Sequence, residues 1–513
     1  MVKNVLQMLE KTAKGVPEQI AFSDEKGAIS YSNAVNLSRS IGTRLARTGK
    51  RNQAVAVLME KSKEILTAFF GIVYSGNFYI PIDTEMPNDR IGKIFSTVHP
   101  FAILSDSASM EKALLLAKES GDSCQVLAYE EVAKTEEDPS LLKAIRDKSI
   151  DTDPVYALFT SGSTGIPKGV ICCHRSVIDY ADWLTDTFSI DKSTIFGNQT
   201  PFYFSMSVLD IYATVRSGAE LHIIPRKLFA FPAKLLEYMN VVKINTIYWV
   251  PTALCIVANM RVLGKIEMPY LRTILFAGEA MPNKQLNVWR KALPNAFYAN
   301  LFGPTEITDI GVYYVVDREF SDDEPLPIGR ACDNVDAMVL NLEGTGLAAE
   351  GEKGELCIRG SFLSMGYYNN PGKTAEVFIQ NPLNTHYPEI IYRTGDLVSV
   401  NERGEMMYHG RRDFQIKHKG NRIELGEIEN AAAAVPGIEM CASIYDTEKE
   451  RIVLFFQGEN VTTQCIRQTM KQKVPPYMLP NVMMQIPVMP RNQNGKIDRK
   501  ALKDYYTEQQ NCK

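Results

Sequence analysis

Short apolar runs and one helical pattern define the first clear unit of the chain. Residues 54–59 and 78–82 are continuous apolar runs of the length typical of buried strands. Between them, residues 62–74 place apolar side chains such as Ile65 and Phe69 at helical spacing. The pattern therefore predicts a strand, a helix and a second strand in sequence, which is a βαβ unit.

The same alternation returns in the middle of the chain. Apolar runs at 246–250, 273–277 and 296–301 are separated by segments that follow Pro251 and Pro282, where we expect helices to begin. Strands that alternate with helices favour a mainly parallel sheet covered on both faces. Ligands bind such sheets at the carboxyl ends of the strands. This rule places the polar, glycine-containing segments 278–279 and 302–306 at a candidate site.

The pattern changes after about residue 400, where shorter apolar runs alternate with two helical segments. This change predicts a separate α+β module. We therefore expect an α/β protein with a large amino-terminal domain, residues 1–412, and a small carboxy-terminal domain, residues 413–513. The strands of the module are expected at 406–408, 414–417, 440–445 and 452–457, and its helices at 424–434 and 464–473.

Composition excludes several classes of protein. The net charge of −4 over 513 residues gives no basic footprint for nucleic acid. The sequence has no apolar run of about eighteen residues and no signal-peptide core at its start, so we expect no membrane insertion and a cytoplasmic location. Nine cysteines without a Cys-x-x-Cys pair and six scattered histidines favour reduced thiols over a disulfide framework or zinc site.

Residues 160–169, Thr-Ser-Gly-Ser-Thr-Gly-Ile-Pro-Lys-Gly, are suited to binding a polyphosphate. Glycines let backbone N–H groups turn around an anion, hydroxyls add donors, and Lys168 adds a positive charge. The loop is not a Walker loop, because Gly169 and apolar residues follow Lys168 and apolar runs flank both sides, which predicts strand, loop, strand. Taken alone, the run is also typical of a flexible surface loop. Its hydroxyl and charged candidates are Thr160, Ser161, Ser163, Thr164 and Lys168.

Further motifs follow this loop in a fixed order. They are Asn-Leu-Phe-Gly-Pro-Thr-Glu at 300–306, Gly-Glu-Leu-Cys-Ile-Arg-Gly at 354–360, Tyr-Arg-Thr-Gly-Asp at 392–396, Gly-Arg-Arg-Asp-Phe-Gln-Ile-Lys at 410–417 and Asn-Gly-Lys at 494–496. Together they resemble the adenylate-forming, AMP-binding enzymes, specifically amino-acid adenylation domains and D-alanine carrier-protein ligases. The resemblance covers essentially the whole chain, which removes the interpretation of 160–169 as a bare surface loop.

The resemblance implies a two-step reaction that uses ATP and Mg²⁺. A carboxylate attacks the α-phosphorus of ATP to give an acyl-AMP and pyrophosphate, and a thiol then takes the acyl group. The implied roles are as follows: Ser161, Thr164 and Lys168 hold the leaving phosphates within the loop that also contains Thr160 and Ser163; Thr305 bonds the α-phosphate; Glu306 binds Mg²⁺; Phe302, between Asn300 and Gly303, stacks on adenine; Asp396 accepts the ribose hydroxyls; and Arg411 contacts the nucleotide.

Two residues near the carboxyl terminus are implied to serve the change between the two steps. Lys496 is expected to lie between the substrate carboxylate and the α-phosphate, where it stabilises charge during adenylation. Asp413 is the expected hinge about which a mobile small domain turns, because that lysine has to leave before the thiol can approach. By residue type alone, Lys496 is typical of a solvated tail and Asp413 of a surface turn.

The expected substrate pocket departs from the family at one residue. Adenylation domains have Phe-Asp-x-Ser, whose Asp balances the α-ammonium group, whereas this chain has Ser205 after Phe204. Either the acid lacks an α-amine, or another carboxylate such as Asp309 balances an amine elsewhere; Asp309 is also compatible with a helix start or a solvent-facing position. The remaining matched positions, whose bulk suggests a small acid and which are equally typical of core, are Met206, Leu209, Tyr248, Leu275, Ala277, Gly278, Leu301 and Ile310.

The thiol acceptor is expected on another molecule, because the chain has no phosphopantetheine-attachment serine in a Gly-Gly-x-Ser setting. A separate acyl or peptidyl carrier protein is favoured by the resemblance, and coenzyme A is the alternative. A non-catalytic binding protein that retains the fold is a further alternative from another class. It is disfavoured because Lys168, Thr305, Glu306, Asp396 and Lys496 occur together.

Overall fold

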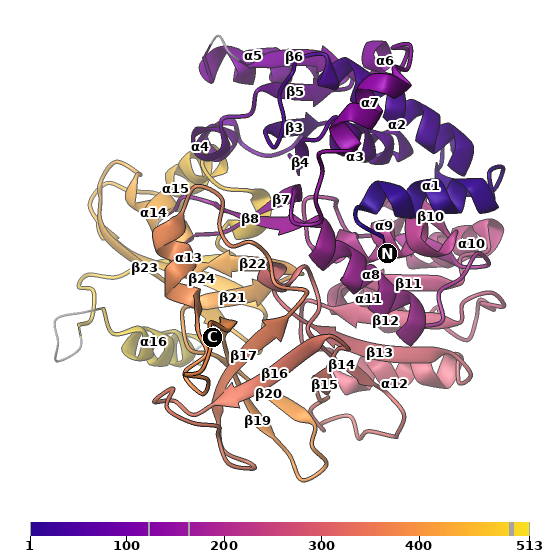
Figure 1. Cartoon of the computed structure of the whole chain (residues 1–513). Helices are drawn as coiled ribbons and strands as arrows, with labels where there is room; N and C mark the ends of the chain where they lie inside the picture. The colour runs from indigo at the N-terminus through magenta and orange to yellow at the C-terminus, as the bar shows by residue number, and fades with distance from the viewer. Residues whose placement is uncertain (1, 122–123, 163–164, 492–496, 512–513) are drawn as a thin grey trace. The chain divides into compact units, whose positions relative to one another are not determined.

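The computed structural model describes residues 2–121, 124–162, 165–491 and 497–511 (Figure 1). The chain divides into two compact units. The first comprises Met1–Thr84, Val98–Phe159 and Gly169–Arg412, and the second comprises Glu85–Thr97, Thr160–Lys168 and Asp413–Lys513. The sequence predicted a boundary after residue 412. It did not predict that two earlier segments would group with the carboxy-terminal residues.

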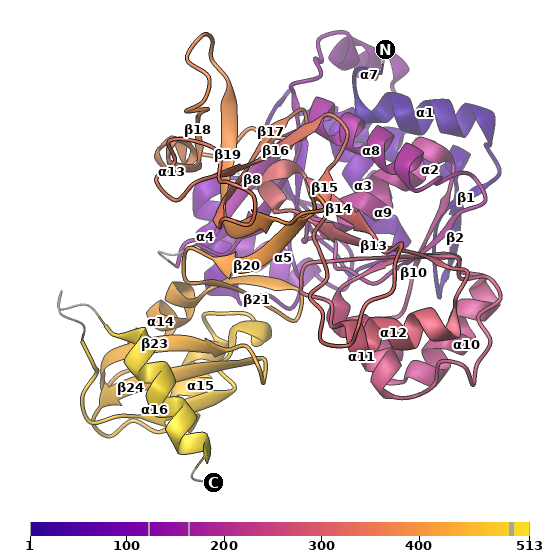
Figure 2. The ribbon, with the colours of Figure 1, turned by 90° about the horizontal axis from the view of Figure 1, so that it is seen from below.

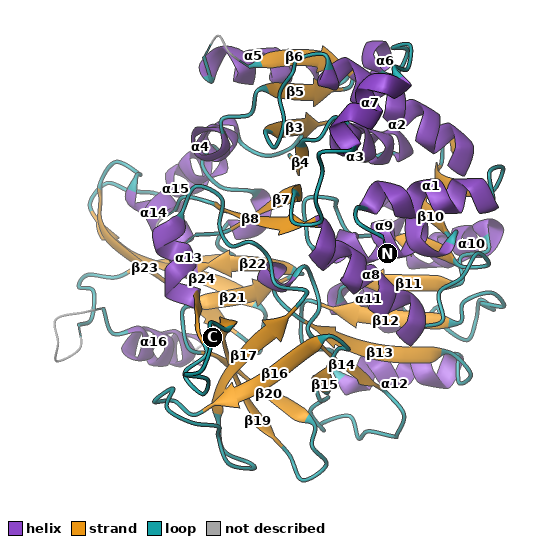
Figure 3. Cartoon of the chain, viewed as in Figure 1, coloured by secondary structure: helices purple, strands orange, loops and turns teal. Residues whose placement is uncertain are grey.

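Two large sheets with mainly parallel strands form most of the first unit (Figure 3). The first contains, in order, β15 (Arg330–Ala331), β14 (Val312–Val315), β13 (Phe297–Phe302), β12 (Thr273–Ala277), β11 (Thr246–Trp249), β9 (Ile195–Asn198), β10 (Glu220–Ile223), β1 (Ile20–Asp24) and β2 (Gly27–Ser30). The second contains β6 (Gln125–Ala128), β5 (Ala102–Ser105), β3 (Ala54–Leu58), β4 (Phe78–Pro81), β7 (Pro154–Thr160) and β8 (Lys168–Cys173). Both predicted alternations are confirmed, including the βαβ unit at β3 and β4.

Helices cover these sheets and pack closely against one another. Helix α3 contacts β1 of one sheet and β3 and β4 of the other, and all of its residues except Glu64 are buried. A Cβ at Gly71 of α3 would lie 2.6 Å from Ile41 of α2, so glycine is required for this close approach. The helices of the first unit are α1 (Val5–Gly15), α2 (Tyr31–Ala46), α3 (Lys63–Tyr74), α5 (Met110–Glu119), α6 (Tyr129–Val132), α7 (Pro139–Arg146), α8 (His174–Thr187), α9 (Met206–Ser217), α10 (Pro232–Val242), α11 (Pro251–Asn259), α12 (Asn283–Ala292), α13 (Pro371–Val377), and the 3₁₀ helices η1 (Arg226–Ala230) and η2 (Thr305–Ile307).

A third sheet completes the first unit. The sequence predicted only part of its last strand, at 406–408, and assigned that strand to the carboxy-terminal module, whereas it belongs to the first unit. The pairings of this sheet are antiparallel. The strands are β16 (Val335–Leu340), β17 (Gly354–Gly360), β19 (Ile390–Val400), β18 (Phe378–Gln380) and β20 (Met406–Arg411). Buried and partly exposed residues alternate along β19.

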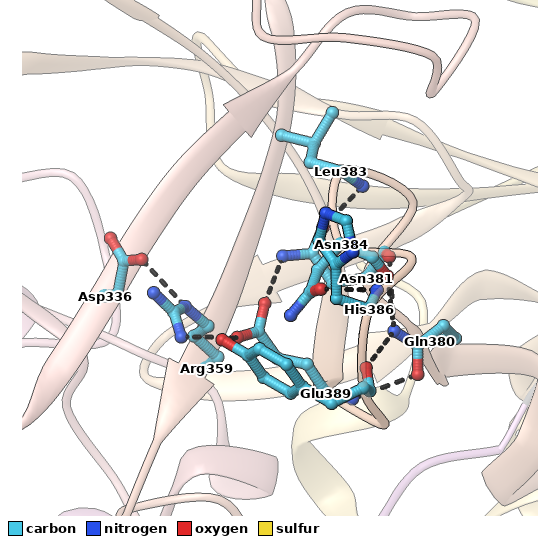
Figure 4. A network of polar contacts seen from close by, with 9 residues as sticks. Asp336, Arg359, Gln380, Asn381, Leu383, Asn384, His386 and Glu389 are labelled. Atoms are coloured by element: carbon cyan, nitrogen blue, oxygen red, sulfur yellow. Dashed lines mark hydrogen bonds and ion pairs between the residues drawn. The ribbon is translucent and has the colours of Figure 1, made fainter.

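Polar contacts hold the long connection between β18 and β19 (Figure 4). The Arg359 guanidinium lies 2.7 Å from Glu389 Oε1 and donates to Asp336 Oδ2 at 2.8 Å. Glu389 also accepts from the Asn381 side chain, and Gln380 donates to the Asn384 carbonyl oxygen at 2.8 Å. These bonds tie the connection to the third sheet, so we assign this network a structural role.

The second unit contains the predicted α+β module (Figure 2). Alternate residues of β24 face two different clusters: Leu454 and Phe456 pack with α14 and α15, and Val453 and Phe455 pack with α16. Its elements are α4 (Asn88–Val98, with Val98 in the first unit), β21 (Gln415–His418), β22 (Asn421–Glu424), α14 (Leu425–Ala433), β23 (Ile438–Asp446), β24 (Arg451–Gly458), α15 (Thr463–Lys471), η3 (Pro476–Met478), β25 (Val482–Gln485) and α16 (Arg499–Asn511).

Two expectations from composition can be compared with the described part of the chain. In those residues, no helix is both long and apolar enough to cross a membrane. The eight cysteines described are free thiols, and five of them, among them Cys172 and Cys173, are buried. This agrees with the expectation of reduced core cysteines.

Candidate active site

The carboxyl ends of β12 and β13 lie beside each other, as the sequence predicted. The two strands are parallel, and Ala277 at the end of β12 pairs with Leu301 near the end of β13. Gly278 therefore follows one strand, with a positive φ of 91°, and Gly303 follows the other. The segment that continues from Gly303 contains three of the polar candidates of the first unit, namely Thr305, Glu306 and Asp309.

Backbone geometry fixes the course of this segment. A Cβ at Gly303 would clash with the carbonyl oxygen of Asp309, so only glycine permits the chain to fold back here. Thr308 has a φ of 72°, in a region that a β-branched residue rarely adopts. Its hydroxyl donates to the Phe362 carbonyl oxygen at 2.8 Å, which helps to hold this conformation. The strained turn delivers Asp309 to a defined position.

Asp309 is buried, with 1 % of its surface exposed. The solvent-facing alternative for this residue is therefore wrong. Its Oδ2 atom accepts hydrogen bonds from the hydroxyls of Tyr180 at 2.8 Å and Tyr248 at 3.1 Å. Burial raises the pKa of Asp309 to about 7, although hydrogen bonds from Tyr180, Tyr248 and Ser205 act in the opposite direction. The result is a carboxylate surrounded by hydroxyl donors in a dry environment.

Ser205 connects this carboxylate to the glutamate- and threonine-containing motif. The Thr305 hydroxyl donates to Ser205 Oγ at 3.3 Å, and Ser205 in turn hydrogen-bonds to Asp309. Ser205 directly precedes α9, while Thr305 begins η2. A continuous line of polar groups therefore runs from Thr305 through Ser205 to Asp309.

The apolar pocket positions predicted from the sequence are buried together. They belong to one large hydrophobic cluster of the first unit, and Met206 is the most exposed of them at 7 %. Phe204 packs its ring against Tyr203 at a centroid distance of 4.7 Å. The clustered positions are Met206, Leu209, Tyr248, Leu275, Ala277, Leu301 and Ile310.

A second buried carboxylate lies on α9, near Asp309. Asp210 accepts from the Asn198 side chain at 2.6 Å, and burial raises its pKa to about 7. Lys61 offers it an attractive charge, while burial lowers the pKa of Lys61 to about 7. The Lys61 ammonium donates to the Gln199 carbonyl oxygen at 3.0 Å. Sequence reasoning missed this pair, because an isolated Lys and Asp carry no motif.

Glu306 is fully buried beside a tyrosine that the sequence analysis did not name. The Tyr367 hydroxyl donates to Glu306 Oε1 at 2.7 Å. Among the described residues, no group of three or more His, Cys, Asp or Glu side chains is arranged to hold a metal ion. Mg²⁺ commonly needs only one or two protein carboxylates when substrate phosphates supply further oxygens. A single Glu therefore fits the ion that the sequence predicted.

The other nucleotide-binding candidates of the first unit have well-defined partners. Asp396 and Arg411 face each other across β19 and β20 and form an ion pair of 2.9 Å, with both side chains buried. The Asn300 amide donates to the Pro327 carbonyl oxygen at 2.8 Å. Phe302 is 7 % exposed and packs against Tyr408, with 5.5 Å between ring centroids. Asn300 therefore stabilises the backbone at Pro327, whereas Asp396 and Arg411 form a buried ion pair.

The phosphate-loop candidates belong to the second unit. The Ser161 hydroxyl donates to the Arg422 carbonyl oxygen at 2.9 Å and accepts from the Glu424 N–H at 3.2 Å. Lys168 lies 3.8 Å from Glu424 Oε1, and both side chains are about nine-tenths buried, at 11 % and 10 % exposure. Thr160, at the end of β7, has a buried hydroxyl. Ser163, Thr164 and Lys496 lie outside the described residues.

The predicted hinge residue is exposed. Asp413 accepts a hydrogen bond from the Gln415 N–H at 3.2 Å, which is the local side-chain-to-backbone contact of an ordinary turn. A hinge role stays a prediction.

Two tyrosines in the site were missed by sequence reasoning. Tyr180 lies on α8 and Tyr367 in the segment before α13, and both hydroxyls donate to carboxylates. Tyr180 follows the helical spacing of a buried face, so its pattern is that of core. The only available signal was that a buried tyrosine hydroxyl needs a partner.

Mainly parallel α/β sheets with polar groups at the carboxyl ends of their strands are the setting in which α/β enzymes bind their ligands. The chain belongs to the AMP-binding enzyme family, whose family model matches residues 9–368. It is an adenylate-forming ligase.

The chain is similar to relatives over nearly its full length. It is 31 % identical over 510 residues to "Zwittermicin A synthase ZmaJ" of Bacillus cereus, which covers 97 % of this chain and 94 % of the relative. It is 29 % identical to the D-alanine–D-alanyl carrier protein ligase of Lacticaseibacillus casei, covering 98 % and 99 %. The Vibrio cholerae adenylation domain AlmE, solved with glycyl-adenosine-5'-phosphate, has the same fold, with a TM-score of 0.85, 24 % identity and coverage of 99 % and 98 %.

Proposed function

We propose that this ligase activates a small carboxylic acid that carries an amine or hydroxyl group, and transfers it to the phosphopantetheine thiol of a separate carrier protein. The observation that carries the proposal is Asp309, a buried carboxylate joined through Ser205 to Thr305. A polar group on the acid supplies the partner that this carboxylate needs. The bulky apolar positions around it favour a short acid.

Several of the candidate residues have proposed roles toward ATP. Lys168 and Ser161 bind the leaving phosphates, and Thr305 bonds the α-phosphate as negative charge develops there. Asp396, held by Arg411, accepts the ribose hydroxyls, and Phe302 stacks on adenine. The other loop hydroxyls, Thr160, Ser163 and Thr164, add donors.

The proposed metal role belongs to Glu306. Its carboxylate, held by Tyr367, together with the phosphates would bind Mg²⁺, which offsets phosphate charge when it is bound.

The proposed acceptor is a carrier protein rather than coenzyme A. Support comes from relatives such as the D-alanine–D-alanyl carrier protein ligase of Lacticaseibacillus casei, which matches along 98 % of this chain. Both acceptors present the same pantetheine arm, so an acceptor assay has to compare them directly.

The test is acid-dependent exchange of pyrophosphate into ATP, measured over a panel of small amino, hydroxy and plain acids. If an amine-bearing acid is preferred, Asp309→Asn lowers its kcat/KM by about 100-fold or more, because the substrate ammonium loses its buried counter-charge. Asp317→Asn is the matched control, since Asp317 also accepts from a tyrosine hydroxyl, Tyr314, at 3.3 Å, but is exposed.

Each outcome of this assay is informative. Preference for a hydroxy or plain acid, with little effect of Asp309→Asn, would show that Ser205 marks the loss of an amine site. If none of the acids in the panel supports pyrophosphate exchange, the proposed activity is contradicted.

A further inference from the structure

We propose that Tyr180 is a specificity-determining positioning residue: with Tyr248 it fixes one oxygen of Asp309, and so directs the carboxylate to a substrate amine that lies beyond the α-position. The inference rests on the proposed function, since it requires that the chain adenylates small acids. It adds a residue of α8 to the pocket and narrows the substrate class.

The hydroxyl of Tyr180 is held in place by its ring. The ring is fully buried, and it packs edge-on against Phe362, with centroids 5.4 Å apart and an interplanar angle of 88°. Trp183, one turn further along α8, lies 5.8 Å away on another side. Tyr248, at β11, is equally buried. Neither ring can move without repacking the core, so two rigid groups define where Asp309 Oδ2 lies.

The hydrogen bonds leave Asp309 with remaining acceptor capacity. A carboxylate has about four lone-pair sites. Two tyrosine hydroxyls occupy Oδ2 and Ser205 supplies a third bond, so about one site is left for a further donor. All three neighbours are neutral hydroxyls, and among the ion pairs of the described residues none involves Asp309. A substrate ammonium group would supply both the missing donor and the missing positive charge.

The position of the anion indicates where the amine lies on the substrate. Ser205 occupies the position of the Asp that balances the α-ammonium group in adenylation domains. Its hydroxyl oxygen lies 3.3 Å from that of Thr305. Asp309 is one hydrogen bond further from Thr305 than Ser205 is. One such bond spans about 2.8 Å between oxygens, whereas one carbon–carbon bond spans about 1.5 Å. The geometry therefore suits an acid whose amine is one or two carbons beyond the α-position.

The charged and titratable groups around Asp309 are compatible with the binding of one substrate ammonium group. Asp210 of α9 and the Cys332 thiol are the other titratable groups that interact with Asp309. Burial raises the pKa of Cys332 well above its usual range, so that thiol is neutral. Lys61 interacts electrostatically with Asp210 and donates to the Gln199 carbonyl oxygen. Among the described residues, the groups that shift the pKa of Asp309 include no cation.

The test compares Tyr180→Phe with Tyr212→Phe in pyrophosphate exchange. Tyr212 is the matched control, because its buried hydroxyl bonds to that of Tyr79 at 2.9 Å and not to Asp309. The probes are 3-aminopropanoic and 4-aminobutanoic acid, with butanoic acid as an amine-free comparison and alanine as an α-amino acid. We expect Tyr180→Phe to raise KM for the preferred ω-amino acid at least about tenfold, with kcat within about twofold and butanoic acid unaffected.

A pH profile separates positioning from a general structural effect. With one donor lost, ionised Asp309 is less stabilised, so in Tyr180→Phe the acid limb of KM for the amine-bearing acid moves to higher pH. Tyr248→Phe gives the same shift, and serves if Tyr180→Phe does not fold. Tyr212→Phe leaves the limb where it is.

The outcomes distinguish this inference from the function on which it rests. If the native chain activates acids but prefers alanine to both ω-amino acids, the inference is overturned and the ligase activity stands. Equal effects of Tyr180→Phe and Tyr212→Phe, or equal effects on amine-bearing and amine-free acids, also overturn it. If the native chain activates no acid, the proposed function fails and the inference falls with it.

Discussion

At the scale of single residues, the ionisation of Asp309 decides what the pocket can bind. Its folded-state pKa of about 7 lies above the ordinary aspartate value because the group is buried. A raised pKa means that the folded protein holds this proton more tightly than the unfolded chain does. The contribution of Asp309 to the free energy of unfolding therefore falls as pH rises toward about 7 and is lowest above that pH, where the group is ionised. A substrate ammonium would compensate the buried negative charge.

This leads to a pH prediction for substrate binding. An amine-bearing acid binds the ionised form of Asp309, so its KM rises as pH falls below about 7, by at most tenfold per pH unit. The measurement is KM between pH 5.5 and 8.5 for 3-aminopropanoic acid, divided by KM for butanoic acid so that effects on ATP cancel. A ratio that is constant with pH would contradict the assigned role of Asp309.

At the scale of elements, the turn between β21 and β22 and the loop between β7 and β8 share partners within the second unit. Lys419 and Gly420 both have positive φ values, 50° and 77°, which form a tight two-residue turn. The turn places Glu424 opposite Gln415. The side-chain amide of Gln415 donates to Glu424 Oε1 at 2.8 Å. Glu424 also faces Lys168, so a protein carboxylate lies where the sequence expects a phosphate to bind.

We predict that Glu424→Gln tightens ATP binding about two- to fivefold, because phosphate no longer competes with a carboxylate for Lys168. Isothermal titration of the full chain with Mg·ATP measures the change. Glu429→Gln is the control: Glu429 lies on α14 and pairs with Arg499 at 2.7 Å. Equal effects of the two variants would attribute the change to net charge alone.

The success of sequence reasoning also varied by element. Strands such as β3 and β12 are buried on both faces, so their continuous apolar runs were readable and their positions were predicted closely. Most of the third sheet escaped prediction because buried positions of β19 include the polar residues Thr394 and Asp396. Its alternation of buried and partly exposed residues therefore does not appear as an alternation of apolar and polar residues in the sequence. That segment was readable as a motif but not as a strand.

The site shows a similar division. Motifs located Glu306, Asp396 and Lys168, since their spacing in the sequence is local. Tyr180 was not predictable, because its contact with Asp309 joins residues 129 positions apart and depends on how α8 packs. The choice between a buried and an exposed Asp309 also needed the structure, because the turn at Thr308 sets its direction.

At the scale of the whole molecule, the proposed reaction needs two arrangements of its parts. The same nucleotide-bound acid has to meet Lys496 in the first step and a thiol in the second. A residue used only in the first step can therefore be removed without loss of the second. This separation is the property that distinguishes Lys496 from a structural lysine.

Lys496→Ala is predicted to lower acyl-AMP formation about 100-fold or more, because developing charge at the α-phosphate loses its cation. Thioester formation from preformed acyl-AMP should stay within about threefold of the native rate. Single-turnover assays with a carrier protein and with coenzyme A measure the second step and identify the acceptor. Lys500→Ala is the control, since Lys500 is exposed at the start of α16. Equal loss of both steps would refute the assignment.

The hydroxyl cradle around Asp309 also constrains how this enzyme can evolve. Its members come from α8, β11 and the residue before α9, so no single segment exchange transfers them. A Ser205→Asp substitution toward an α-amino acid pocket would place a second carboxylate against Asp309, and both could not ionise together. Asp309 would have to be lost first or simultaneously. Conversion to a pocket for an α-amino acid therefore depends on the order of the substitutions at positions 205 and 309, and not only on their number.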